Sequence, residues 1–291
     1  MFVEGYLGEG LSVPQATYGV PHSIADLTPS LAALWGLRKP AQCQAKVIPA
    51  LLKAAREKLG AGQKLQKTFF FCPDAIGDVM LRDFPGEFSY LQEHADIRVR
   101  STAVMPSVTP VCFSSIFTGA APATHGVVTG ARPRPILTVE TLFDVLIEAG
   151  QEIAIVASNN CSIDRIFRDR SMDYYSTRGN AQSFELCQLL LERYDYDVIV
   201  CYDGGYDSFS HKFGSRAKES FAALRASLER FKLLDERLAE TWKEHNYMLT
   251  FTPDHGNHNY REGKATHGYD MYDDMVINHF YKIAGAQKVE A

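Results

Sequence analysis

The chain has 291 residues, of which 46% are hydrophobic, and its formal net charge is −5. This composition excludes an intrinsically disordered chain and supplies enough apolar side chains for one large folded domain. Basic and aromatic residues do not cluster together, so we expect no nucleic-acid polymer as a partner. The first residues lack the features of a signal peptide and no apolar run is long enough to span a membrane, so we predict a cytoplasmic protein with no membrane partner.

The order of apolar and polar segments predicts the fold class. Residues 23–35 and 45–59 are predicted to be helices, and short β-rich runs alternate with helical ones from residue 68 onward. The expected strands are 68–72, 97–105, 152–158, 197–203 and 247–252, and the expected helices are 77–93, 110–118, 140–150, 184–194 and 215–245. Such βαβ alternation predicts an α/β fold with a doubly wound, largely parallel sheet and helices on both faces. Residues 159–180 fit this pattern poorly and are expected to form a small excursion over the active face.

Acidic residues follow two of the apolar runs. Asp74 comes directly after the run KTFFFCP, and Asp254 and His255 come directly after YMLTFTP. Open α/β sheets bind their ligands at the carboxyl ends of strands, so these side chains are candidate metal ligands. The alternative is that each of them is an ordinary turn residue that binds no metal. Asp78 is an alternative carboxylate to Asp74.

Asp207 and His211 are four positions apart in GGYDSFSHKFG. If this segment is helical, the carboxylate and the imidazole lie on one face, within reach of one cation. The alternatives are an N-cap aspartate with an exposed histidine, and Asp203 as the ligand in place of Asp207. His267, in KATHGYD, is a single loop histidine whose candidacy depends on the other clusters.

Thr109 is followed by Pro110, which predicts a helix with the threonine as N-cap and the proline at the first helical position. The N-terminus of a helix attracts anionic phosphate groups. A hydroxyl group held there beside a metal ion could act as a nucleophile.

Taken in chain order, these motifs resemble the alkaline phosphatase superfamily. They are Asp74, the segment PSVTPVCFSSIFTGAAPATHG, DSFSHKFG, TPDHG and THG, and their likeness is greatest to the type I phosphodiesterase/nucleotide pyrophosphatase branch. The resemblance covers most of residues 67–283. It implies an alkaline-phosphatase-like catalytic domain at 67–291 with only a small cap or insertion. Residues 1–66 add little to the resemblance; from their helical pattern we expect an N-terminal helical extension packed on that domain, with a surface for a partner as the alternative.

The resemblance also implies a site with two divalent metal ions, zinc by preference and manganese as the alternative. The matching residues are Asp207, His211 and His267 for one ion and Asp74, Asp254 and His255 for the other. Thr109 would be the catalytic nucleophile, forming a phospho-threonine that water hydrolyses. The expected function is cleavage of a phosphodiester or pyrophosphate bond in a small phosphorylated substrate. The alternatives are a phosphomonoester or phosphonate hydrolase, a phosphotransferase, and a non-catalytic metal-binding scaffold.

Two positions depart from the family pattern. Cys112 stands where the diesterase branch usually has an asparagine that holds a phosphate oxygen, and a thiol is a much weaker donor. We therefore expect that oxygen to be bound by the backbone amides of Val111 and Cys112, or by Arg132 or Lys264. Ala75 stands where a glycine is usual.

Overall fold

The computed structural model describes residues 18–131, 136–261 and 263–287. A sheet of eight strands lies at its centre, in the order β1-β3-β10-β7-β2-β6-β4-β5. Neighbouring strands pair in parallel except at β10 (Val276–Ala284), which is antiparallel to both β3 and β7. The other strands are β1 (His22–Ser23), β2 (Lys67–Pro73), β3 (Ile97–Thr102), β4 (Ile153–Ser158), β5 (Asp173–Thr177), β6 (Val198–Asp203) and β7 (Tyr247–Phe251).

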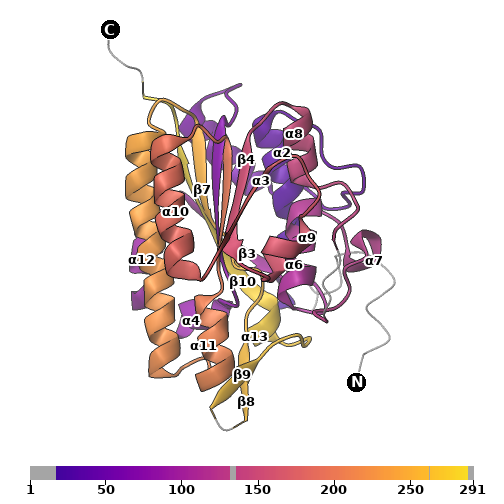
Figure 1. Ribbon diagram of the computed structural model, residues 1–291, viewed down its shortest axis with the longest axis vertical. Helices are drawn as coiled ribbons and strands as arrows, with labels where there is room; N and C mark the ends of the chain where they lie inside the picture. Colours follow the sequence, from indigo (N-terminus) through magenta and orange to yellow (C-terminus); the bar gives the residue numbers. More distant parts are fainter. Residues whose placement is uncertain (1–17, 132–135, 262, 288–291) are drawn as a thin grey trace.

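Helices cover both faces of this sheet (Figure 1). One face packs against α2 (Leu27–Trp35), α3 (Pro49–Leu59), α6 (Thr109–Thr118), α8 (Leu142–Glu148) and α9 (Ser162–Ile166). The other packs against α4 (Asp78–Asp83), α5 (Ser89–His94), α10 (Asn180–Arg193) and α12 (Lys218–Thr241). Two short 3-10 helices, η1 (Ile24–Asp26) and η2 (Pro85–Phe88), complete these layers. The predicted doubly wound α/β fold is therefore confirmed.

The sequence of β2 explains why the sheet needs helices on both faces. Phe70 and Cys72 pack into the apolar cluster that includes α6, whereas Phe69 and Phe71 pack into the cluster that includes α12. Alternate side chains of a strand point to opposite faces, so a strand that is apolar throughout has to be buried on both of them. All seven residues of β2 are buried.

Two predicted segments differ from the structure. The helix expected at 77–93 is divided into α4, η2 and α5, because Pro85 cannot continue the hydrogen-bond ladder of α4. Residues 159–180 are not an excursion from the fold: they contain α9 and β5, and β5 is the outermost strand at one edge of the sheet.

The described part of the N-terminal region contributes to the main core. Helices α2 and α3 belong to the same apolar cluster as α6 and the sheet, and β1 pairs with the end of β3. The division of the chain at residue 67 stays a prediction.

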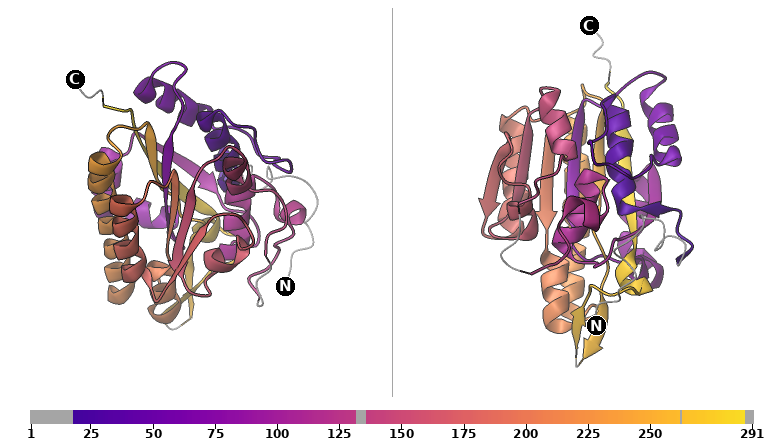
Figure 2. Two further views of the ribbon diagram at one scale, coloured as in Figure 1. Left: turned by 45° about the horizontal axis from the view of Figure 1, so that its top comes forward. Right: turned by 90° about the vertical axis from the view of Figure 1, so that its right-hand side faces the viewer.

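The remaining elements gather at the carboxyl end of the sheet (Figure 1). They are α11 (Gly205–Phe213), the antiparallel pair β8 (His258–Arg261) and β9 (Lys264–Thr266), and α13 (Tyr272–Met275). Helix α7 (Pro122–His125) lies beside α6. The β8–β9 hairpin extends away from the sheet (Figure 2). Loops at this end are where a doubly wound sheet places its ligands.

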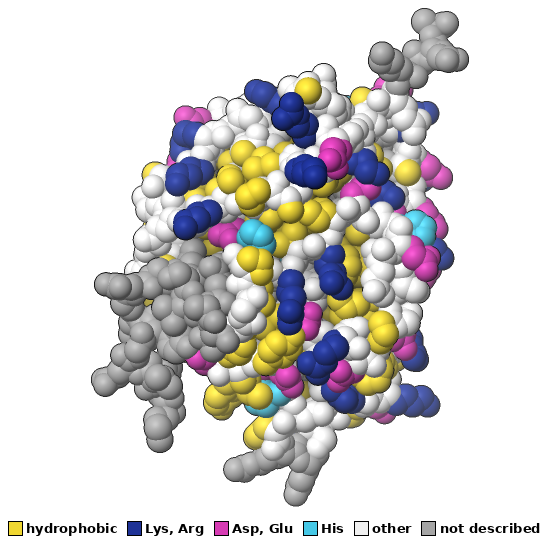
Figure 3. Space-filling view, turned by 180° about the vertical axis from the view of Figure 1, so that it is seen from behind, with side chains coloured by type: hydrophobic (Ala, Val, Ile, Leu, Met, Phe, Trp, Pro, Cys, Tyr) yellow, Lys and Arg dark blue, Asp and Glu magenta, His cyan; other side chains and the backbone are white. Residues whose placement is uncertain are grey.

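The surface opposite the view of Figure 1 carries basic side chains interspersed with acidic and apolar ones (Figure 3). Among the described helices, none combines the length and the apolar character needed to cross a bilayer.

His125 is a buried histidine outside the candidate site. It ends α7, its Nδ1 accepts a hydrogen bond from the amide of Val127 (3.1 Å), and its Nε2 contacts Ser115 Oγ (2.9 Å). Burial lowers the pKa of His125 to about 4. The folded protein therefore keeps this ring neutral over a pH range in which an exposed histidine is protonated.

We expect the stabilising effect of His125 to depend on pH. Its folded-state pKa lies below the unfolded value of about 6.5, so its contribution is complete above pH ~6.5 and is lost as the pH falls toward ~4. The difference in free energy of unfolding between the wild type and His125→Asn should therefore shrink, by about 1 to 3 kcal/mol, between pH ~7 and pH ~4.5 in urea titrations. His94→Asn, at an exposed position, is the control. A difference that stays constant over this range would contradict the prediction.

Candidate functional site

The candidate site lies at the carboxyl edge of the sheet, where β2, β6 and β7 are neighbours. Asp74 is the first residue after β2, and its amide donates to the carbonyl oxygen of Asp203 at the end of β6 (2.9 Å). Asp254 follows β7, and Asp207 lies in the first turn of α11, directly after β6. Adjacent parallel strands end at the same edge, so side chains far apart in the sequence meet there.

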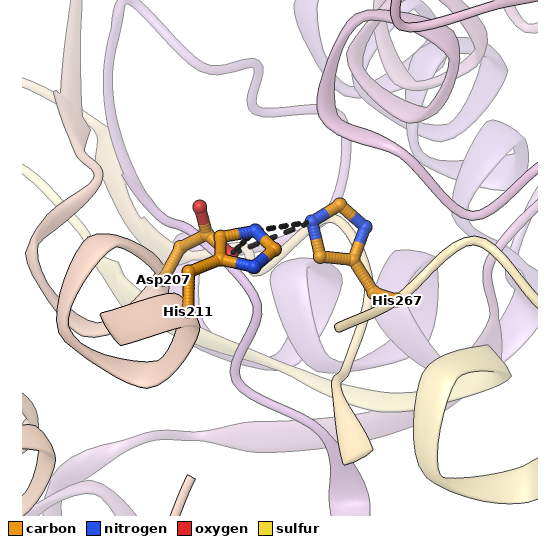
Figure 4. Close-up of side chains that lie close together, drawn as sticks. All are labelled: Asp207, His211 and His267. Carbon is orange, nitrogen blue, oxygen red and sulfur yellow. Dashed lines mark hydrogen bonds and ion pairs between the residues drawn. The ribbon is translucent and has the colours of Figure 1, made fainter. Parts of the chain in front are cut away.

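One group of candidate ligands is formed by Asp207, His211 and His267, with one ligand atom of each within 4.8 Å of the others. Asp207 Oδ1 lies 3.2 Å from His211 Nε2 and 3.5 Å from His267 Nε2. The two Nε2 atoms are 3.1 Å apart. Figure 4 shows the ring of His267 directed toward Asp207 and His211. The helical spacing expected for Asp207 and His211 is present, because both lie on α11.

The second group is formed by Asp74, Asp254 and His255, which are buried. One ligand atom of each again lies within 4.8 Å of the others. His255 Nε2 lies 3.5 Å from Asp74 Oδ1 and 3.3 Å from Asp254 Oδ2. The ring of His255 stacks on that of His267 with their centroids 4.0 Å apart, so the two groups adjoin. The structure thus brings together all six residues that the sequence suggested as ligands.

Thr109 lies beside the second group. Its hydroxyl group donates to Asp74 Oδ2 (3.1 Å) and lies 3.4 Å from His255 Nε2. Helix α6 begins at Thr109 itself with Val108 as its N-cap, so the expected N-cap role of Thr109 was wrong by one residue. The hydroxyl group is consequently not used for capping and is directed at the aspartate.

The three histidines share one orientation. Each directs Nδ1 at a backbone carbonyl oxygen, and the pairs are His211 with Ala265 (3.0 Å), His267 with Ser107 (2.9 Å) and His255 with Gly256 (2.9 Å). A carbonyl oxygen only accepts hydrogen bonds, so Nδ1 carries the proton in all three rings. In a neutral ring Nε2 then presents its lone pair, which is the orientation of a metal-ligating histidine.

Electrostatics in the site favour added positive charge. Burial, followed by the charge of Asp207, raises the pKa of Asp74 to about 7, and burial raises the pKa of Asp254 well above its usual value. The hydrogen bond to Asp207 raises the pKa of His211 to about 9, whereas burial lowers the pKa of His255 and of His267 to about 4. The site therefore combines crowded carboxylates with two neutral imidazoles.

The residues of both groups fit divalent cations. In the buried group, one carboxylate oxygen of each aspartate, Asp74 Oδ1 and Asp254 Oδ2, makes no hydrogen bond. Both of these oxygens face Nε2 of His255. Unpaired buried oxygens and facing lone pairs are costly, and a cation bound among them would remove that cost.

The alternative carboxylates belong to other networks. Asp203 pairs with Arg230 (2.6 Å) and accepts a hydrogen bond from Ser227 (3.1 Å), so it does not replace Asp207. Asp78 accepts hydrogen bonds from Asn278 (2.8 Å) and from the hydroxyl group of Tyr272 (2.5 Å), so it does not replace Asp74.

The expected phosphate-binding amides are already engaged. The amides of Val111 and Cys112 both donate to the carbonyl oxygen of Val108 at 3.0 Å, which contradicts the role expected for them. The thiol of Cys112 is fully buried and directed at the carbonyl oxygen of Val104 (3.8 Å), so it faces the core. Arg132 lies outside the described residues, and Lys264 is exposed on β9. Its role stays a prediction.

Sequence reasoning missed Tyr202. Its hydroxyl group donates to Asp74 Oδ2, the oxygen that also accepts the hydrogen bond from Thr109. A signal for it was present, because Val198, Val200 and Tyr202 alternate along β6 and belong to the same apolar cluster as α6. That alternation directs Tyr202 to the face on which Thr109 lies.

Comparison with known proteins shows which solved structures have a similar fold. Protein-family models and curated protein sequences give no match. Among solved structures, one similar structure is murine ectonucleotide pyrophosphatase/phosphodiesterase 5, as an inactive threonine-to-alanine variant in complex with AMP. The two structures match with a TM-score of 0.53 at 16% sequence identity, over 68% of this chain and 59% of the murine chain. The human protein of the same name has a TM-score of 0.52 at 15% identity, with 67% and 58% covered.

Phosphonoacetate hydrolase from Sinorhizobium meliloti 1021, in complex with phosphonoacetate, has a TM-score of 0.51 at 18% identity, with 68% of this chain and 58% of its own covered. The chain therefore has the α/β fold of these alkaline phosphatase superfamily proteins, as its motifs predicted. It spans less than two thirds of the length of each of them.

Ala75 explains the second departure from the family pattern. Its φ is 65°, in the left-handed region, and its amide donates to Asp254 Oδ1 (3.2 Å). Glycine adopts this conformation without steric cost, which accounts for its usual presence here. Here the alanine adopts the same left-handed conformation.

We expect substitutions of Ala75 to follow its backbone conformation. In Ala75→Gly, relief of about 1 to 2 kcal/mol of left-handed strain offsets the loss of one buried methyl group, worth about 0.8 kcal/mol, so stability should change by less than about 1 kcal/mol. Ala75→Val should be destabilised by more than about 2 kcal/mol, because a β-branched residue fits this region poorly. Urea unfolding measures both changes. Equal stability of the valine variant and the wild type would refute this account.

Proposed function

We propose that the chain is a metal-dependent phosphohydrolase that cleaves a phosphodiester or pyrophosphate bond through a phospho-threonine intermediate at Thr109. The observation that carries the proposal is the position of the Thr109 hydroxyl group. It lies within hydrogen-bond distance of Asp74 (3.1 Å), beside two adjoining groups of candidate metal ligands. The proposed nucleophile therefore lies beside an oriented carboxylate and beside two groups of side chains that suit divalent cations.

Two divalent cations would be held by the two groups already described, Asp207, His211 and His267 in one and Asp74, Asp254 and His255 in the other. When bound, they supply positive charge that stabilises phosphate oxygens and lowers the pKa of a nearby hydroxyl group. Mixed aspartate and histidine ligands suit zinc, with manganese as the alternative. Three ligands per ion leave positions open for substrate, as a catalytic site requires.

The chain's own residues orient the reaction. Asp74 Oδ2 accepts hydrogen bonds from both Thr109 and Tyr202, which holds the carboxylate and fixes the direction of the Thr109 O–H bond toward it. Thr109 Oγ1 forms a bond to phosphorus and loses its proton to water, while the bond from phosphorus to the leaving oxygen breaks and that oxygen takes up a proton from water. The positive end of α6, a helix of 10 residues, stabilises the resulting phospho-threonine. Water then takes the phosphoryl group and restores the Thr109 hydroxyl group.

The ligands of the similar structures agree in kind with this proposal. The murine protein was captured with AMP and the Sinorhizobium protein with phosphonoacetate. Both are small molecules that carry a phosphate or phosphonate group. The second of them supports one alternative, a phosphonate hydrolase, and the phosphomonoesterase and phosphotransferase alternatives share the same nucleophile. A rate survey over nucleotide diesters, monoesters and phosphonates, with analysis of phosphorylated acceptor products, distinguishes these activities.

Metal content tests the two ligand groups directly. We expect the purified zinc-loaded protein to hold two ions per chain, one for each group. His211→Ala and Asp254→Ala should each lower this to about one ion, because each removes one of three ligands from a different group. Elemental analysis after gel filtration measures the content, and exposed His94→Ala is the control. A wild-type protein that retains no ion after loading would refute the proposed metal site.

Substitution of Thr109 tests the nucleophile. Thr109→Ala should lower the rate of aryl phosphodiester cleavage by at least about 10³-fold while the metal content stays at the wild-type level, because only the attacking oxygen is lost. Thr109→Ser keeps a hydroxyl group and should retain measurable cleavage. The measurement is release of the aryl alcohol under saturating zinc. If the alanine variant cleaves as fast as the wild type, Thr109 is not the nucleophile.

A further inference from the structure

Asp274 is a buried acidic residue that belongs to neither ligand group. It lies on α13, in the segment between the loop that carries His267 and strand β10. Its exposed fraction is 0%, and neither of its carboxylate oxygens is without a partner. A buried carboxylate is stable only when it is well hydrogen-bonded, so its partners indicate its role.

The hydrogen bonds of Asp274 join the two loops that carry His255 and His267. Its Oδ1 lies 2.7 Å from Nδ1 of His258, and its backbone oxygen accepts from the amide of Gly256 (2.8 Å). Both partners follow His255 closely in the sequence. Its Oδ2 accepts from the amide of Tyr269, two residues after His267 (3.0 Å). One residue therefore connects a loop of each ligand group.

These contacts continue to the imidazole rings themselves. The carbonyl oxygen of Gly256 is the partner of His255 Nδ1 (2.9 Å). On the other side, Ser107 Oγ donates to the carbonyl oxygen of Tyr269 (3.3 Å), and the carbonyl oxygen of Ser107 is the partner of His267 Nδ1 (2.9 Å). The carbonyl oxygen that faces His255 thus belongs to Gly256, whose amide donates to the backbone oxygen of Asp274. The carbonyl oxygen that faces His267 belongs to Ser107, whose side chain donates to Tyr269.

Close packing leaves this arrangement little freedom. A Cβ atom added to Gly256 would lie 1.9 Å from the carbonyl oxygen of Asp273, so the backbone before Asp274 rests directly against the turn after His255. The amide of Ala103, on the connection from β3 toward α6, donates to the carbonyl oxygen of Met275 (2.7 Å). The segment around α13 therefore also contacts the connection that leads to Thr109.

We propose that Asp274 is a positioning residue that holds the loops of His255 and His267 in mutual register, so that the two ligand groups form together. In this role Asp274 does not contact metal or substrate. It sets the stacked arrangement of the two rings, whose centroids are 4.0 Å apart, and thereby the direction of both Nε2 atoms. This inference rests on the proposed function, because metal affinity is what the positioning would change.

The test is zinc affinity, measured by competition with a chromophoric chelator, for each group separately. The background His211→Ala leaves the group of Asp74, Asp254 and His255 complete, and the background Asp254→Ala leaves the other group complete. Adding Asp274→Ala should lower the zinc affinity by about 10- to 100-fold in both backgrounds, as loss of residues that orient metal ligands typically does. The Co²⁺ absorption spectrum of the folded protein should change in both backgrounds as well.

Two further variants separate positioning from a general loss of stability. Asp274→Asn keeps an oxygen acceptor for the amide of Tyr269 but loses the carboxylate contact to His258. It should weaken the group of His255 several-fold more than the group of His267. Asp164→Ala is the matched control, because Asp164 is also buried (4% exposed) and accepts hydrogen bonds from the amide of Asn160 (2.9 Å) and from Ser176 (2.5 Å). It should lower the melting temperature and leave both zinc affinities unchanged.

The possible outcomes are distinct. Wild-type zinc affinity and Co²⁺ spectra in Asp274→Ala, with only a lower melting temperature, would overturn the positioning role while leaving the proposed function intact. Loss of affinity in only one background would overturn the claim that Asp274 serves both groups. A wild-type protein that binds no zinc would refute the proposed function and this inference together. If Asp274→Ala does not fold, Asp274→Asn tests the role in its place. In that case, a zinc affinity that Asp274→Asn leaves unchanged in both the His211→Ala and the Asp254→Ala background would overturn the positioning role.

Discussion

Mutual repulsion among three aspartates is the constraint on which the site depends. Asp74 and Asp254 are buried to within 1% of complete burial, Asp207 adjoins them, and burial raises the pKa of the first two. Carboxylates placed so close together are held there only by a rigid frame or by compensating charge. The frame is the sheet: β7, β2 and β6 are consecutive neighbours, and each delivers one carboxylate to the same edge. The compensating charge is what we propose the metal ions supply.

The frame is rigid because its core is apolar on both faces. Phe69 and Phe71 pack on one side of β2 and Phe70 on the other, so apolar contacts hold the strand from both faces. The loops are held differently, by hydrogen bonds between imidazole Nδ1 atoms and backbone carbonyl oxygens. Strand register thus places the aspartates, whereas local loop geometry sets the direction of the histidines.

The parts of the site that the sequence predicted are those with a local signal. An apolar run that ends in an acidic residue placed Asp74 and Asp254, and a four-residue spacing placed Asp207 and His211 on one helix. The residues that were missed act through contacts distant in sequence: Tyr202 is 128 positions from Asp74. Cys112 shows the opposite error, because its position after Thr109 suggested a role in the site, whereas the rotation of α6 turns its thiol into the core. Sequence spacing fixes which residues share a helix, but the orientation of that helix depends on the tertiary packing.

The two ligand groups differ in their access to solvent, so the site has a buried side and an exposed side. The side chains of Asp254 and His255 are fully buried, whereas that of His211 is 43% exposed. Thr109 lies against the buried group and is itself only 8% exposed. The group that Thr109 contacts is therefore the inner one, and the group of Asp207, His211 and His267 lies nearer the solvent.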